Sequence, residues 1–532
     1  MIPSGEDIKR QVIPRWRTVR ATTEAGEQVS VNPQQSTELE NGLAARMAQE
    51  FELRLKEWQQ EKDIPAAEEL LAAAIVIGTV VDDVRAAARL VAGDDHSLRG
   101  SKDIARSILG IHNPEAHEPL SDETTKMRLE IARRKRLLRM YPRDALLLTE
   151  TALQYTNLGM NDPAARLLKN AAAVAPNNRY VLRSLTRFWV HWGEPDKALH
   201  FLSKSEATRH DPWLMAAQMA AEDVARKPPS FWREARRLLG ADRYSDFELA
   251  ELAAAAGTLQ LEAGSHKIAR KLFRRSLTAP TENAVAQAHW ASRRDPAIDA
   301  SRAITPDAFE ALTWENIATG RPSEAVSAAA QWQSIEPFSL RPAGTGSFIA
   351  VSYLGDGRLA EIFCRRGLIA NRGSSALHNN LAVALAIQGR IDDAKKELAN
   401  IKSHLSITEQ VVNFATQGLI EMRGGNLDEG GRLYQKAIEI AIDSKSRLLW
   451  CRAAAHYVAE CARYDNSDLP ESAALIEKVF DGLDDRTKSL ASDVPAILAR
   501  AKKTRSASEI IEAIGSLPRN TLISYPIDNE VV

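Results

Sequence analysis

The chain has 532 residues, which corresponds to about three or four domain-sized units unless it grows along one axis, as repeat arrays do. Its 69 basic and 70 acidic residues nearly cancel, which argues against a general attraction to nucleic acid or to an anionic membrane. Abundant alanine with only 6% aromatic residues favours closely packed helices over sheets.

Residues 1–35 are polar, contain Pro3, Pro14 and Pro33, and show no sustained hydrophobic period. Such a composition predicts an extended or disordered arm. The first residues contain no apolar signal core, and they include Glu6 and Asp7. We therefore expect a cytoplasmic protein.

Residues 36–141 are expected to form a helical N-terminal region, because apolar residues recur at helical spacing and no alternating stretch is long enough for a strand. Ser36 and Thr37 can cap its first helix, and Pro65 can open the second as its first residue. The apolar run from Leu70 to Val81 has 12 residues, too few for a membrane helix of about 20. The four expected helices cover about residues 36–62, 65–91, 102–109 and 121–141.

From about residue 145 onward, a pattern of small and apolar residues repeats. In the segment LHNNLAVALAIQGRIDDAKKEL, residues 377–398, Ala382 and Leu385 are followed by a single Gly389 and then by Ala394. Small residues let neighbouring helices approach closely, and the glycine permits a left-handed turn between them. Matching residues recur at Ala152, Gly159 and Ala164; Gly193 and Ala198; Gly257, Gly264 and Ala269; Gly320 and Ala325; Gly355 and Ala360; and Gly418, Gly425 and Gly430.

The turn glycines make the period measurable. Where neighbouring copies are regular they lie 34 to 36 residues apart: Gly159 to Gly193, Gly320 to Gly355, Gly355 to Gly389, and Gly389 to Gly425. The longer gaps on either side of Gly264 predict two degenerate copies, at about residues 213–239 and 283–292. A final copy is expected at 448–480, so that a repeat array covers 142–482, and 483–532 hold a helix at about 504–517 and a tail.

This pattern resembles the tetratricopeptide repeat family, whose unit is a helix–turn–helix of about 34 residues with small residues at fixed positions. The resemblance covers about residues 145–480, and Pro176 and Pro337 stand where the family places a proline after the second helix. Thr186 and Thr313 replace small residues of the pattern, which predicts less regular packing there. The resemblance implies an all-α fold, a right-handed α-solenoid of helical hairpins that follows the helical N-terminal region.

In this family the first helices of the units line a concave groove that binds a peptide or a partner helix. Arg183, Arg187 and Asn379 resemble the residues with which some members hold a peptide carboxylate, which favours an acidic partner. The alternative for each candidate is a solvated or capping side chain. Carried over by position, the groove candidates are Arg183, Arg187, His191, Glu310, Trp314, Thr345, Tyr353, Asn379, Arg423, Arg452 and His456.

A catalytic alternative concerns the region that the repeats do not explain. Some helical ribonucleases carry an arginine and a histidine separated by four to six residues, and Arg106 with His112 fits this spacing. With 48 arginines and 11 histidines, about three such pairs are expected by chance, and three are present. The spacing alone therefore does not identify a nuclease.

A basic stretch and three cysteines are further candidates for binding chemistry. The stretch KMRLEIARRKRLLRM, residues 126–140, has seven basic residues that could contact phosphates or form a solvated outer face, and the balanced net charge favours the second interpretation. Cys364, Cys451 and Cys461 match no common zinc pattern, so we expect buried, reduced thiols. No cofactor or metal is expected.

The sequence thus predicts a non-catalytic scaffold or adaptor that binds another protein or a peptide, without a membrane. The alternatives are a helical N-terminal nuclease or effector regulated by the repeats, and a regulator that senses a peptide or, less expected, a nucleic acid. The excess of arginine over lysine, 48 against 21, suggests a bacterium with a GC-rich genome.

Overall fold

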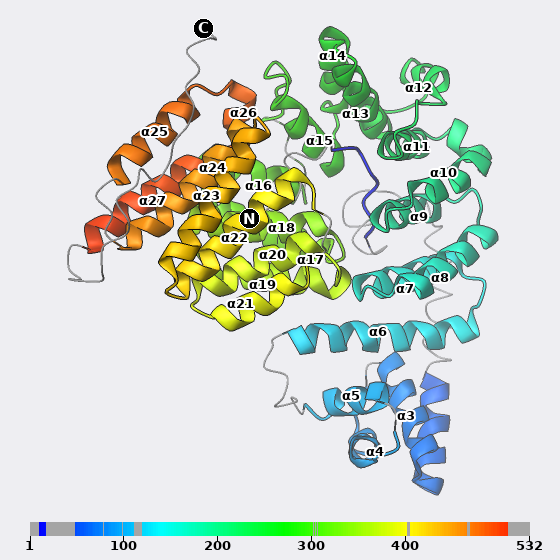
Figure 1. Ribbon diagram of the computed structural model, residues 1–532. Coiled ribbons are helices and arrows are strands. Elements are labelled where there is room, and N and C mark those ends of the chain that lie inside the picture. The colour runs from blue at the N-terminus through cyan, green and yellow to red at the C-terminus, as the bar shows by residue number, and fades with distance from the viewer. Residues whose placement is uncertain are drawn as a thin grey trace. The chain divides into compact units, whose positions relative to one another are not determined.

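The computed structural model describes residues 10–17, 48–77, 79–97, 99–110, 120–301, 303, 305, 307–401, 405–464 and 469–508. Within these residues the structure contains helices and no strand, which confirms the all-α prediction (Figure 1). The chain divides into two compact units. The N-terminal unit runs from Ile13 to Glu234, and the C-terminal unit comprises Ala235–Val532 together with the residues up to Val12.

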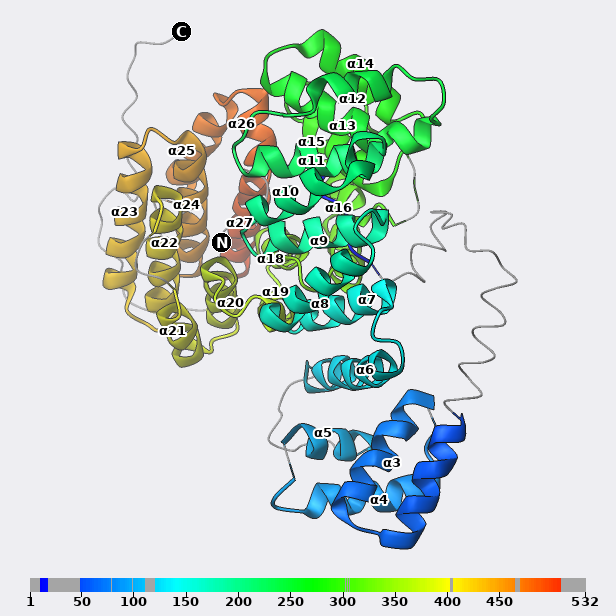
Figure 2. The same cartoon turned by 90° about the vertical axis from the view of Figure 1, so that its right-hand side faces the viewer.

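The N-terminal unit begins with a small bundle. Its helices α3, α4 and α5 pack on one another, and α6 contacts α3 on one side and α7 on the other (Figure 2). A helix over residues 48–61 precedes them. The helices of this unit are α3 (Ile64–Ile77), α4 (Asp82–Gly93), α5 (Arg99–Ile108), α6 (Leu120–Met140), α7 (Ala145–Asn157), α8 (Asn161–Val174), α9 (Arg179–His191), α10 (Pro195–Lys204), the short η1 (Glu206–Arg209) and α11 (Pro212–Val224); α12 (Trp232–Leu239) crosses the unit boundary.

The C-terminal unit holds the remaining helices. In Figure 2, α22, α23, α24 and α25 stand side by side in it. Its elements are α13 (Asp246–Glu262), α14 (His266–Ser276), α15 (Glu282–Ser292), α16 (Phe309–Ala318), α17 (Pro322–Ile335), α18 (Leu340–Ile349), the π-helical turn η2 (Ala350–Leu354), α19 (Gly357–Ala370), α20 (Ser375–Ile387), α21 (Ile391–Ala399), α22 (Ile407–Arg423), α23 (Leu427–Asp443), α24 (Arg447–Cys461), η3 (Ala462–Tyr464), α25 (Leu469–Asp481), α26 (Asp485–Leu490) and α27 (Asp493–Ser508).

Helices pack in consecutive pairs. The pairs are α7 with α8, α9 with α10, α13 with α14, α16 with α17, α18 with α19, α20 with α21, α22 with α23, and α24 with α25. In the regular stretches, the first helix of a pair also contacts the first helix of the next, as α18, α20, α22 and α24 do in succession. In the same stretches a second helix contacts the first helix that follows it, as α17 contacts α18, α19 contacts α20 and α23 contacts α24.

The turn between the two helices of a pair requires glycine. Seven glycines from the predicted repeat have left-handed backbone angles, with φ between 69° and 92°: Gly159, Gly193, Gly264, Gly320, Gly355, Gly389 and Gly425. An L side chain is strained in that conformation. At the start of most first helices, the side chain of the preceding residue accepts a hydrogen bond from a main-chain amide of the first turn. These residues are Asp144, Asn178, Ser245, Ser374, Ser406 and Ser446. Asp211 and Thr281 cap α11 and α15 in the same way.

Three expected elements differ in the structure. The helix expected from Pro65 to Val91 is two helices, because the β-branched Thr79, Val80 and Val81 interrupt it and Asp82 begins a new helix. The copy expected at 283–292 is the single helix α15. After it, Asp295 accepts two hydrogen bonds from Arg270 of α14, and the described residues between α15 and α16 form no helix.

The C-terminal prediction also changes. The last described helix, α27, begins at Asp493, whereas the sequence predicted a helix at about 504–517. Residues after 508 lie outside the described part of the chain, as do most of the expected arm and the start of the helix expected at 36. Within the arm, residues 10–17 are extended and largely buried.

Candidate functional site

All eleven predicted groove residues lie on first helices of pairs, or on the π-helical turn that continues one. Arg183, Arg187 and His191 are on α9 in the N-terminal unit, and the other eight are on α16, α18, η2, α20, α22 and α24 in the C-terminal unit. Arg183 and Arg187 thus belong to one compact unit, and Asn379 belongs to the other.

The three predicted groove residues on α9 are buried or partly buried. Arg183 is only 7% exposed, and its guanidinium carbon lies 4.4 Å from the centre of the Trp213 ring. Stacking of this kind uses the cationic face of the arginine. Arg187 and His191 are partly buried on the same helix.

The C-terminal unit holds Arg10 in a polar pocket. Glu310, the predicted groove residue on α16, accepts two hydrogen bonds from Arg10: Nε to Oε1 at 3.0 Å and Nη2 to Oε2 at 2.9 Å. On α15, Asn283 Oδ1 lies 2.8 Å from Nη2, and Gln287 Oε1 lies 2.5 Å from Nη1. Arg10 is 3% exposed and Glu310 is 2% exposed, so the charged pair is almost completely removed from water.

The same pocket also holds the main chain. Gln287 Nε2 donates to the carbonyl oxygen of Arg10 at 2.8 Å and to Thr258 Oγ1 at 2.8 Å. Asn283 and Gln287 are four residues apart and therefore share one face of α15. On the other side of the pocket, Arg341 of α18 reaches Glu310 Oε1 at 2.5 Å. We call Asn283, Gln287, Glu310 and Arg341 the arginine pocket.

Residues 13–17 make a corresponding contact within the N-terminal unit. Trp16 is fully buried and meets the edge of the Phe188 ring, with centroids 6.2 Å apart. The hydroxyl of Tyr180 lies 2.9 Å from the carbonyl oxygen of Arg17 and 2.9 Å from Glu150 Oε1. Burial beside this carboxylate raises the pKa of Tyr180 well above its usual value, so the phenol keeps its proton for donation.

Asn379 of α20 differs from the other candidates. It is 2% exposed, and neither side-chain amide atom has a hydrogen-bond partner among the described residues. A buried primary amide without partners costs roughly 1–3 kcal/mol. Its neighbour Asn380, in contrast, donates to Ser347 Oγ at 3.1 Å. Thr345, on α18, is also buried.

The remaining candidates are engaged by other helices. Arg452 of α24 pairs with Asp493 at 3.1 Å, and Tyr353 of η2 lies 2.8 Å from Ser492 Oγ, just before α27. Arg423 pairs with Glu460 at 2.5 Å, an ion pair between α22 and α24. Trp314 is buried and lies under Arg293.

His456, the last predicted groove residue, is influenced by the charge of Arg500 on α27. Its side chain is partly buried on α24. Burial, together with the positive charges of Arg500 and Arg452, lowers its pKa well below the usual value. The imidazole is therefore neutral in the folded protein at neutral pH. α27 thus contacts the part of the C-terminal unit in which Tyr353, Arg452 and His456 were expected to face a partner.

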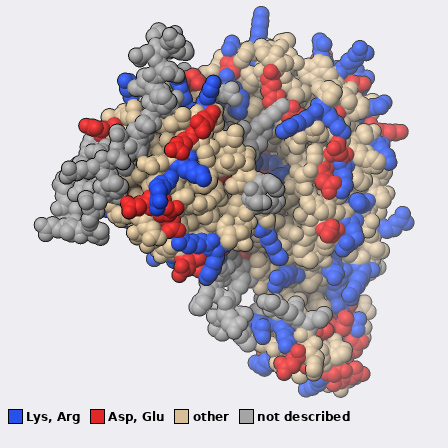
Figure 3. Space-filling model, in the orientation of Figure 1, with Lys and Arg blue, Asp and Glu red and all other residues tan. Residues whose placement is uncertain are grey.

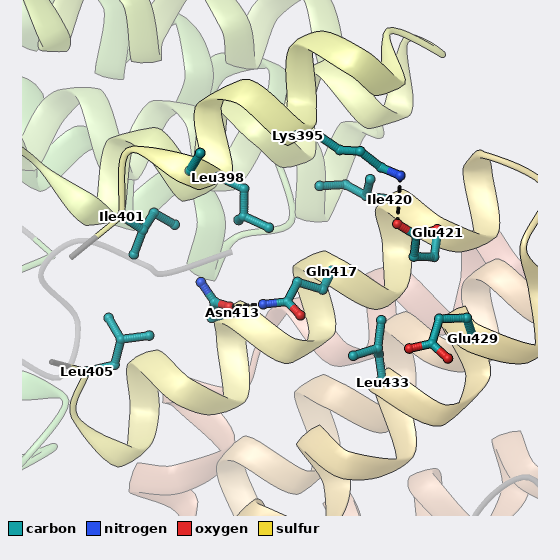
Figure 4. Close-up of a pocket in the computed structure, with 11 residues that line it drawn as sticks. Lys395, Leu398, Ile401, Leu405, Asn413, Gln417, Ile420, Glu421, Glu429 and Leu433 are labelled. Carbon is teal, nitrogen blue, oxygen red and sulfur yellow. Dashed lines mark hydrogen bonds and ion pairs between the residues drawn. The ribbon is translucent and has the colours of Figure 1, made fainter. Parts of the chain in front are cut away.

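A separate pocket of about 600 Å³ lies between α21, α22 and α23 (Figure 4). Leu398, Ile401 and Leu405 form one apolar side, while Asn413 and Gln417 are bonded to each other and Lys395 pairs with Glu421 at 2.8 Å. None of the predicted groove residues lines it. Glu429, which also lines the pocket, pairs with Arg432 outside the lining.

The catalytic alternative gains no geometry. Arg106 is on α5, but His112 lies outside the described residues. In the pair Arg372 and His378, the histidine ring is held between the carbonyl oxygen of Arg372 at 2.8 Å and Glu397 at 2.7 Å, a structural link. Among the described residues, no group of three histidine, cysteine or acidic side chains could hold a metal ion.

The cysteines are free and buried, as predicted. Burial raises the pKa of the Cys364, Cys451 and Cys461 thiols to about 12 in each case. At neutral pH they are protonated, and a thiol in that state is a poor nucleophile and a poor metal ligand.

The basic helix α6 uses part of its charge internally. Arg134 pairs with Glu130 and Glu150, and Arg136 pairs with Glu50 and Glu69. On the face shown in Figure 3, basic and acidic side chains are interspersed. Across the described part of the chain, no helix has both the length and the apolar character needed to cross a membrane.

Comparison of the sequence with protein-family models and with curated proteins found no match. The repeat pattern does not mark Arg10, Asn283, Gln287 or Arg341 as parts of one pocket. A signal was present in RQVIPRWR, residues 10–17, whose apolar residues and tryptophan are unusual in a polar arm. A second signal was the polar pair Asn283 and Gln287 at helical spacing, with only apolar residues between them.

Proposed function

We propose that this protein is a non-catalytic scaffold or adaptor whose helical pairs form a right-handed solenoid of tetratricopeptide-like repeats and bind an extended segment of a partner protein. The observation that carries the proposal is the way in which helices hold residues 10–17: α15 and α16 bind Arg10, and α9 contacts Arg17. They bind an extended chain through both a side chain and main-chain carbonyl oxygens, which is how a peptide ligand is bound.

The pairing supports the solenoid. Turn glycines at intervals of 34 to 36 residues and contacts between successive first helices are what stacked helical hairpins require. In such an array, the first helices together form a continuous surface. The acidic Glu310 at the occupied pocket favours a basic partner segment there, in place of the acidic partner that Arg183 and Arg187 had suggested.

Asn379 provides the test, because its unpaired amide is suited to a partner's main chain. Asn379→Leu keeps the number and branching of the side-chain heavy atoms and removes a buried unpaired amide, so we expect little change in stability. Cross-linked capture from cells that naturally produce the protein should lose a partner that the wild type retains. Lys396→Gln on the second helix α21, where the side chain is 77% exposed, is the matched control and should retain that partner.

Asn380→Leu gives a contrast on the same helix, since it removes a bonded amide and should lower the melting temperature. If Asn379→Leu and wild type capture the same partners, or if the wild type captures none, the proposed function is wrong.

A further inference from the structure

The arginine pocket holds Arg10, which belongs to an extended segment and not to the surrounding helices. All the side chains that contact the Arg10 guanidinium come from helices more than 270 positions further along the chain. Residues 10–17 form no helix, and the 30 residues 18–47 separate them from the next described residue. The segment is therefore not helical, and 30 residues of chain join it to the next described helix.

The geometry of the pocket selects arginine. Glu310 receives two parallel hydrogen bonds from Nε and Nη2, while Asn283 and Gln287 accept from the two outer nitrogens. A planar guanidinium satisfies all four acceptor positions at once, which the point-like ammonium of lysine cannot do. Lysine in this place would leave buried oxygen atoms without donors.

Glu310 has a second positive partner besides Arg10. Arg341 is bonded to the same Glu310 carboxylate, and its own side chain is 31% exposed. When Arg10 leaves, Glu310 therefore keeps a positive partner and is not left as an isolated buried charge. Thr258 still holds the amide of Gln287, so part of the arrangement persists without the ligand.

We infer that the arginine pocket is the specificity site for an arginine in an extended, basic segment of a partner protein, and that Arg10 occupies it as an intramolecular competitor. This inference rests on the proposed function. The native segment RQVIPRWR carries three arginines and no acidic residue, and it defines the chemistry that the site accepts. A short flexible linker gives an intramolecular competitor an effective concentration of the order of millimolar, and on that scale a free peptide of equal affinity cannot compete well below that level.

The probe is a fluorescent, acetylated peptide with the sequence of residues 10–17, titrated by anisotropy. We compare the full-length wild type with the full-length variant Arg10→Ala/Trp16→Ala, in which the competitor has lost both buried anchors. The variant should bind the peptide at micromolar concentrations, and the wild type should not bind it below about millimolar. A peptide with lysine for its first arginine should bind the variant at least about tenfold more weakly.

Adding Glu310→Gln to the double variant should also weaken binding of the arginine peptide, because the bidentate carboxylate is lost. If the folded double variant does not bind the peptide, or if the lysine peptide binds equally well, the inference is wrong. Circular dichroism establishes that the variant is folded.

Hydrogen exchange on the wild type gives a test without any substitution. The amides of residues 11–13 and 15–17 should exchange faster than those of α16, through release of the segment alone. Exchange of both at the same rate would show that the segment is a fixed part of the fold and would overturn the inference. Peptide binding combined with no captured partner would instead contradict only the proposed function.

Discussion

Gly418 shows how a single missing Cβ sets the distance between two helices. A Cβ at this position would lie 2.7 Å from Cδ2 of Tyr434 and 2.9 Å from the carbonyl oxygen of Gly430. Glycine-to-alanine changes in helices are normally stabilising by about 1 kcal/mol, but here main-chain atoms of α23 block the methyl group. We expect Gly418→Ala to lower the free energy of unfolding by about 1–3 kcal/mol in guanidinium titrations.

Gly373→Ala is the matched control, because a Cβ there meets nothing within 4 Å. Its effect should stay within about 0.5 kcal/mol. Equal effects of the two substitutions would contradict a tight contact between α22 and α23 at Gly418.

His456 gives the fold a specific dependence on pH. Its pKa is lowered in the folded state by burial and by Arg500 and Arg452, whereas in the unfolded chain it is near 6.5. The unfolded chain therefore binds the proton more readily, so stability is full above about pH 6.5 and falls as the pH drops below it. The loss is at most about 1.4 kcal/mol per pH unit.

Melting temperatures measured between about pH 7.5 and about pH 5.5 should fall less steeply for His456→Gln than for the wild type. Some dependence will remain, because burial also lowers the pKa of His289. The same slope in both proteins would contradict the assignment.

At the scale of elements, α27 is held by a buried ion pair and an apolar face. Val494 and Ile497 are fully buried, and Asp493 pairs with Arg452. Asp493→Ala leaves Arg452 buried without its carboxylate, at a cost of about 3–5 kcal/mol. We expect faster hydrogen exchange confined to α27 and the start of α24.

Lys502→Ala, on the same helix, removes an exposed pair with Glu477 and is expected to cost less than about 1 kcal/mol. If Asp493→Ala changes exchange no more than this control does, the ion pair does not dock α27.

Local periodicity predicted the paired helices, but it missed one helix break and the start of one helix. Turn glycines such as Gly355 and Gly389 repeat at a fixed interval and have a local steric cause, so the paired helices between them were predictable. The break before Asp82 was missed because the apolar run continues through β-branched residues. The start of α27 at Asp493 was missed as well, because its docking depends on Arg452 in a different helix.

At the scale of the whole molecule, the arginine pocket could not be derived from the sequence. Glu310 was identified by its position in the repeat, but its partner Arg10 lies 300 positions away in a segment without periodicity. Asn283 and Gln287 lie on α15, which is a single helix and not part of a pair, so the repeat pattern did not mark them. Pairings of this kind depend on long-range contacts, which a local pattern does not contain.

The distribution of the apolar core predicts how stability is divided along the chain. One core runs from Ile317 to Ala501, and a separate one runs from Phe51 to Ala105. Helical arrays unfold in segments because each pair contacts mainly its neighbours. Leu381→Ala in the first core and Leu70→Ala in the second should each cost about 2–5 kcal/mol locally, since both leucines are at most 1% exposed.

Hydrogen exchange in guanidinium just below the unfolding transition resolves the two. Leu381→Ala should speed exchange in α18, α20 and α22 and leave α3 and α4 unchanged, and Leu70→Ala should do the reverse. The two cores share no residue and belong to different compact units, so we expect each substitution to change exchange only in its own core. Faster exchange in both cores after either substitution would mean that the chain unfolds as a single cooperative unit.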